Sequence, residues 1–134
     1  MLDPHGALIY TMVLVTGAEA RLPAAERNII GDIINHLPVF HGFDHGKLAT
    51  HLNGCAELLS REDGLDDAID AIKAALPQRL RETAYAIACD LIASDGSATQ
   101  EELQLLELMR ERFEIDRLIA AALERGARAR FQKV

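Results

Sequence analysis

The spacing of hydrophobic residues predicts helices along the whole chain. In one stretch after another, apolar residues recur three, four and seven positions apart, which gathers them on one face of a helix. Ile69, Ile72 and Leu76 follow this spacing. No stretch alternates apolar and polar residues over a useful length, so the pattern predicts no strand. We therefore expect an all-α protein.

Turn residues divide the pattern into about seven helices. Asp3 and Pro4 open the first helix, whose residues are apolar nearly all round, so we expect this helix at the centre of the fold. It ends within 17–20, and the least regular segment of the chain lies at 37–46. Asp44 is expected to cap the third helix, and Asp116 the seventh. The later helices are predicted to begin at 23, 44, 66, 77, 100 and 118 and to end near 36, 62, 76, 94, 113 and 127.

The segment 90–102 is predicted to be a tight corner between the fifth and sixth helices. Its sequence is Asp-Leu-Ile-Ala-Ser-Asp-Gly-Ser-Ala-Thr-Gln-Glu-Glu. Gly96 readily takes the left-handed conformation that ends a helix. Thr99 and Glu102 have the spacing of a capping box, in which each side chain accepts a hydrogen bond from the other residue's amide. The corner carries four carboxylates, at Asp90, Asp95, Glu101 and Glu102.

A weaker copy of this corner lies near the start of the sequence. Glu19 and Glu26 are seven positions apart, as Asp95 and Glu102 are, and the second pair follows the first by 76 positions. Several apolar positions keep the same offset, which favours an internal duplication. We therefore predict that the first two helices and the fifth and sixth helices form antiparallel hairpins related by a pseudo-twofold axis.

Two segments carry a resemblance to a known family. They are Ala-Ser-Asp-Gly-Ser-Ala-Thr-Gln-Glu-Glu with Leu-Gln-Leu-Leu after it, at 93–106, and Gly-Ala-Glu-Ala-Arg-Leu-Pro-Ala-Ala-Glu, at 17–26. With these segments the chain resembles the TerB-like, tellurite-resistance-associated proteins, a group that includes the N-terminal domain of DjlA-type co-chaperones. The resemblance covers nearly the whole chain. It implies one all-helical domain of about seven helices with an acidic, cation-binding surface and a role in the response to metal or envelope stress.

Composition and charge narrow the class of protein. A chain of 134 residues has the size of one domain, here 1–134. The net charge of −7 repels phosphate backbones, so we expect no nucleic-acid partner. The basic run at 125–133 is interpreted as a solvated helix end.

With no secretory signal and an uncharged run at 6–18 that is too short to span a bilayer, we expect a cytoplasmic protein that does not span the membrane. Cys55 and Cys89 lie on apolar helical stretches, which predicts two buried free thiols.

The carboxylates of the two corners are candidate ligands for a hard cation. The corner matches half of the EF-hand pattern, with Asp95, Gly96 and Glu102 at its fifth, sixth and twelfth positions. The first and third positions would be Leu91 and Ala93, which cannot bind a metal, so further oxygens must come from elsewhere. Such a site would hold calcium, magnesium or manganese with a dissociation constant on the order of 10⁻⁴ M. The candidate metal ligands are Asp95, Glu102, Asp90, Glu19 and Glu26.

Two classes of function remain open from the sequence, and neither is enzymatic. The chain has no glycine-rich phosphate loop and no nucleophile motif, and its histidines lack the spacing of zinc ligands. The first class is a cation-binding module of a stress response. The second is an interaction scaffold whose acidic face docks a basic or membrane-bound protein without an ion, because the same carboxylates can serve as helix caps and docking charges.

Overall fold

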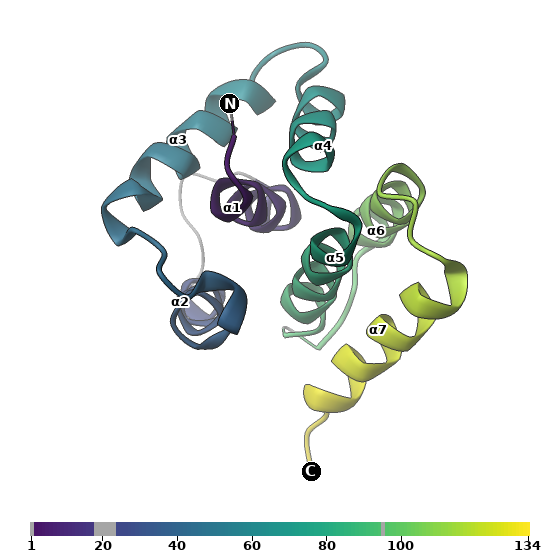
Figure 1. Cartoon of the computed structure of the whole chain (residues 1–134). Helices are drawn as coiled ribbons and strands as arrows, with labels where there is room; N and C mark the ends of the chain where they lie inside the picture. Colours follow the sequence, from purple (N-terminus) through teal and green to yellow (C-terminus); the bar gives the residue numbers. More distant parts are fainter. Residues whose placement is uncertain (1, 18–23, 95) are drawn as a thin grey trace.

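All regular structure in the described part of this computed structural model, residues 2–17, 24–94 and 96–134, is helical (Figure 1). This confirms the all-α prediction. Two short 3-10 turns, η1 (Pro38–Phe40) and η2 (His45–Lys47), lie between the second and third helices. The α-helices are α1 (Pro4–Thr16), α2 (Ala24–His36), α3 (Leu48–Leu59), α4 (Gly64–Ala75), α5 (Gln78–Ala93), α6 (Gln100–Arg112) and α7 (Arg117–Arg130).

Helix α1 is the centre of the fold, as its uniformly apolar sequence predicts. It packs against α3, α4 and α5, and Figure 1 shows it lying between α3 on one side and α4 and α5 on the other. Leu8, Ile9 and Met12 are at most 1% exposed. A helix can be apolar on every face only if neighbours cover every face, and α1 meets that condition. None of the described helices combines the length and apolar character that a membrane span requires.

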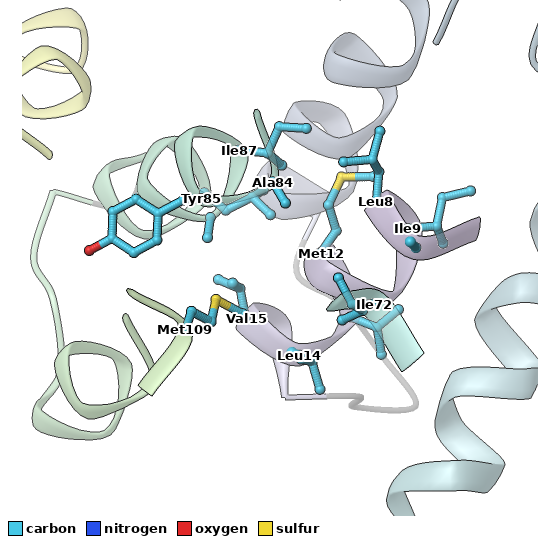
Figure 2. Close-up of a cluster of buried hydrophobic side chains, with 14 of the residues drawn as sticks. Leu8, Ile9, Met12, Leu14, Val15, Ile72, Ala84, Tyr85, Ile87 and Met109 are labelled. Carbon is cyan, nitrogen blue, oxygen red and sulfur yellow. The ribbon is translucent and has the colours of Figure 1, made fainter. Parts of the chain in front are cut away.

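The core is formed mainly by aliphatic side chains from α1, α4, α5 and α6 (Figure 2). Met12 of α1, Ile72 of α4 and Met109 of α6 are all buried in it. The two largest fully buried side chains are aromatic, Tyr85 on α5 and Phe113 directly after α6. In Figure 2 the phenol oxygen of Tyr85 points away from the labelled core residues, and this orientation matters for the site described below.

Helix caps appear where short-range chemistry predicts them. Asp3 accepts a hydrogen bond from the amide of Gly6 at 2.7 Å and begins α1. Asp116 accepts from the amides of Leu118 and Ile119 and begins α7. These contacts satisfy amides that have no partner inside their own helix.

Three boundaries differ from the sequence-based prediction. The cap at Asp44 was expected to begin the third α-helix, but it begins the 3-10 turn η2, and α3 follows from Leu48. Helix α4 begins at Gly64, two residues earlier than expected. Helix α7 continues to Arg130 instead of ending near 127, and its last residue, Arg130, forms an ion pair with Asp90 on α5.

The predicted pseudo-twofold relation between two hairpins stays a prediction. Helices α5 and α6 pack against each other as expected, while α2 packs mainly on α5 and η1. Residues 18–23 of the first corner, including Glu19, and Asp95 of the second corner lie outside the described residues. The positions of the two corners are therefore not compared.

Candidate functional site

Asp90 is paired with a distant arginine. It lies in the last turn of α5, where a negative charge opposes the helix dipole and costs stability. Its carboxylate accepts a hydrogen bond from the guanidinium of Arg130 near the end of α7, and the two groups form an ion pair. The side chain of Asp90 is 25% exposed and that of Arg130 is 57% exposed. The unfavourable position of Asp90 is thus offset by a cation from another helix.

Glu102 takes part in the capping box that the sequence predicts. Its carboxylate accepts a hydrogen bond from the amide of Thr99 at 2.9 Å, and the hydroxyl of Thr99 accepts one from the amide of Glu102 at 3.1 Å. Both hydrogen bonds fix the start of α6. The two candidate ligands whose side chains are described, Asp90 and Glu102, therefore each have a partner within the protein.

The remaining candidate ligands lie outside the described residues. This applies to Asp95 and Glu19 as whole residues and to the side chain of Glu26, whose backbone belongs to α2. Within the described part of the chain, no three histidine, cysteine, aspartate or glutamate side chains come together as metal ligands would. The cation site remains a hypothesis that rests on the sequence.

A cavity of about 390 Å³ opens beside the corner, and we call it the corner groove. Its walls are the C-terminal end of α5, the turn at 96–98, the start of α6 and residues 124–133 of α7 and the segment after it. The volume falls within the range of about 300–1,000 Å³ that is usual for ligand sites. Apolar side chains make up much of the lining, namely Ile92, Ala98, Leu103, Leu106, Ala127 and Phe131.

Among the charged residues that line the corner groove, cations outnumber carboxylates. Arg128 and Lys133 line it and are exposed, and neither forms an ion pair with any described residue. Glu124 also lines the groove, and its carboxylate accepts a hydrogen bond from the Tyr85 hydroxyl at 2.9 Å. The chain as a whole carries a net charge of −7, so an unpaired basic edge on an apolar groove is a local exception.

Cys89 forms part of the groove wall, but its thiol is not a nucleophile at neutral pH. The pKa of Cys89 is raised to about 12, chiefly by burial and also by the nearby carboxylates of Glu124 and Asp90, while Arg130 acts in the opposite direction. Burial likewise raises the pKa of Cys55, on α3, to about 12. The reactive species of cysteine is the thiolate, and both residues hold their protons well above pH 7.

We expect both thiols to resist thiol-disulfide reagents until the protein unfolds. A pKa near 12 instead of 9 leaves a thiolate fraction roughly a thousandfold smaller at pH 8, and both side chains are buried. Since the folded-state pKa exceeds the unfolded one, this contribution to stability is complete below about pH 9 and is lost as the pH rises towards 12. The check is labelling with dithionitrobenzoate in increasing urea, where reaction should follow the unfolding transition. One thiol that reacts rapidly in native protein contradicts the expectation.

A cluster of histidine and phenylalanine side chains lies at the N-terminal end of α1. His5 stacks on Phe40 and meets Phe43 edge to face, with ring centroids 5.7 and 5.3 Å apart. The Nε2 atom of His51 is buried without a hydrogen-bond partner among the described residues, and a carboxylate oxygen of Asp3 lies 4.0 Å away. His5 also lies 2.9 Å, through its Nε2 atom, from the carbonyl oxygen of Val39, so these side chains tie η1 and the start of α3 to α1.

The sequence interpretation of the basic run at 125–133 as a solvated helix end was incomplete. Its basic residues are exposed at or near the end of α7, but Arg130 also binds Asp90, and Arg128 and Lys133 line the corner groove. One signal was available: Leu123, Ala127 and Phe131 are four residues apart, which indicates a packed face that continues past 127.

Comparison with known proteins adds no support for a family. No protein-family model, no curated protein and no solved structure matches this chain. The TerB-like resemblance therefore stays an expectation that rests on the segments 17–26 and 93–106.

Proposed function

We propose that this chain is a non-enzymatic helical interaction module that binds a partner protein in the corner groove and needs no metal ion to do so. One observation carries the proposal: two described carboxylates of the corner are already engaged, Asp90 by Arg130 and Glu102 by Thr99, while an apolar groove opens beside them whose two lining cations have no ion-pair partner among the described residues. Carboxylates that neutralise a cation or cap a helix have a sufficient structural role.

The chemistry of the groove supports binding more than catalysis. Its thiol, Cys89, keeps its proton, and its carboxylate, Glu124, is hydrogen-bonded to Tyr85. General acid–base or nucleophilic catalysis needs an activated group next to a base, and no histidine is among the lining residues that the structure describes. On the TerB-like resemblance, we propose that the partner belongs to a metal or envelope stress response.

Thermal unfolding with and without divalent cations tests whether an ion is needed. The proposal expects the melting temperature to be the same in calcium, magnesium or manganese at millimolar concentration and constant ionic strength. A cation site would instead stabilise the protein by about 2.7 kcal/mol at a hundredfold excess over the dissociation constant. Asp95→Asn and Glu102→Gln separate the two cases, since Gln keeps the capping box but weakens ion binding. Stabilisation of the wild type that both variants lose would overturn the metal-independent function.

Site-specific photo-crosslinking tests whether the groove is the binding face. A photo-reactive residue at Leu103, which lines the groove, should form an adduct with one cellular protein. The same residue at Leu65 on α4 is the matched control, because Leu65 and Leu103 are 43% and 48% exposed. The adduct is identified by mass, and the purified partner must then bind the wild-type chain in solution. Equal adducts at both positions, or none at Leu103, contradict the proposal.

A further inference from the structure

We propose that the corner groove recognises an acidic peptide segment with a large apolar side chain at its centre, which the groove buries while Arg128 and Lys133 bind the flanking carboxylates. This inference rests on the proposed function and names the chemistry of the partner. It differs from the docking mode that the sequence alone suggests, in which the acidic surface of this protein meets a basic partner.

The apolar lining accounts for the central side chain of the segment. Ile92 and Leu106 are buried or nearly so at the back of the groove, and Leu103 is 48% exposed at the first turn of α6. The apolar lining therefore extends from buried side chains to an exposed one at the start of α6. A surface of this kind suits an extended occupant that anchors one side chain and continues across the surface, as peptides do in helical grooves. Burying an aliphatic or aromatic side chain contributes about 1.5–3 kcal/mol.

The charged residues of the groove determine the sign of the charge that a bound segment should carry. Several cations elsewhere on this protein are paired: Arg112 binds Asp66 and Asp70, and Lys73 binds Glu114. Beside the groove, Arg130 is likewise occupied by Asp90. Arg128 and Lys133 line the groove and have no carboxylate partner among the described residues, so both are open to a bound segment.

Carboxylates of a bound segment would form ion pairs with Arg128 and Lys133. A guanidinium can donate two parallel hydrogen bonds to one carboxylate, which favours carboxylates over neutral amides at Arg128. Glu124 is the carboxylate of the described lining, so the acids of the segment are expected on the side of Arg128 and Lys133 and away from Glu124. The net charge of −7 does not prevent this binding, because repulsion from carboxylates much farther from the groove than about 8 Å is largely screened at physiological ionic strength.

Three matched peptides test the preference by fluorescence polarisation. Each is fluorescein-labelled and carries Leu-Phe at its centre, flanked on both sides by Glu-Glu, Gln-Gln or Lys-Lys. We expect the Glu peptide to bind roughly tenfold more tightly than the Gln peptide, as two partly exposed ion pairs would give, and the Lys peptide to bind most weakly. Binding of the Glu peptide should weaken with salt. A Glu peptide with Ser-Ser in place of Leu-Phe should not bind, since it lacks the anchor.

Charge reversal provides the decisive variant. Arg128→Glu with Lys133→Glu should reverse the order, so that the Lys peptide binds more tightly than the Glu peptide. Lys47→Glu with Arg79→Glu makes the same change in net charge on exposed residues far from the groove and should leave the order unchanged. Thermal melts show whether each variant is folded, and a reversed preference is a gain that unfolding cannot produce.

The outcomes separate this inference from the proposed function. An order of affinities that is unchanged at Arg128 and Lys133, or equally changed in the control, overturns the inference. If a crosslinked partner occupies the groove but the peptides show no preference for acids, the inference fails and the interaction module stands. If no partner crosslinks at Leu103 and no peptide binds, both fail.

Discussion

Replacing Phe113 by alanine should lower the free energy of unfolding by about 3–5 kcal/mol. The ring of Phe113 is fully buried where α6 ends, and alanine would leave a cavity that the surrounding side chains only partly fill. The carbonyl of Phe113 also accepts a hydrogen bond from the Gln78 side chain at the start of α5. A shift of this backbone would disturb both helices. Domains of this size are stable by only about 5–15 kcal/mol, so the variant should be close to unfolding.

Urea unfolding followed by circular dichroism measures this loss. Leu118→Ala is the control, because Leu118 is 81% exposed in the first turn of α7 and its removal should change stability by less than about 0.5 kcal/mol. Similar losses in the two variants would show that Phe113 is not the core residue described here.

Replacing Gly64 by alanine should destabilise the protein by about 3 kcal/mol, although alanine is the better helix former. Gly64 is the first residue of α4, and a Cβ atom there would lie 2.3 Å from the carbonyl oxygen of Leu58 and 2.8 Å from the Cα of Leu59. These atoms belong to the backbone of α3, so the clash cannot be relieved by a rotamer change. The two helices would have to move apart, and both pack on α1.

Gly31→Ala is the matched variant for this experiment. Gly31 lies inside α2, and no described atom other than those of its own helix and neighbours comes within 4 Å of the position a Cβ would take. Alanine there should stabilise the protein by about 0.5–1 kcal/mol through helix propensity alone. Urea unfolding of both variants gives the comparison, and a stabilising effect at Gly64 would contradict the close approach of α3 and α4.

The candidate site combines local features that the sequence predicts with distant ones that it does not. The capping box of Thr99 and Glu102 spans three positions, so its geometry follows from the helix start alone. The partners of Asp90 and Tyr85 are 40 and 39 positions away in α7. Periodicity shows that α7 is a helix, but it does not show which end of α5 its arginines reach.

The sequence by itself determined the class of fold, the central position of α1 and the caps at Asp3, Thr99 and Asp116. Each of these depends on residues a few positions apart, where hydrogen bonding and helical periodicity are fixed by short-range geometry. A helix that is apolar on all sides also has only one stable place, inside its neighbours.

Only the tertiary structure decided what surrounds the corner. Packing of α7 on α5 brings Arg130 to Asp90 and puts Arg128 and Lys133 on the edge of an apolar groove. Such contacts depend on how whole helices pack, and no local pattern encodes the distance between two helices that are far apart in the chain.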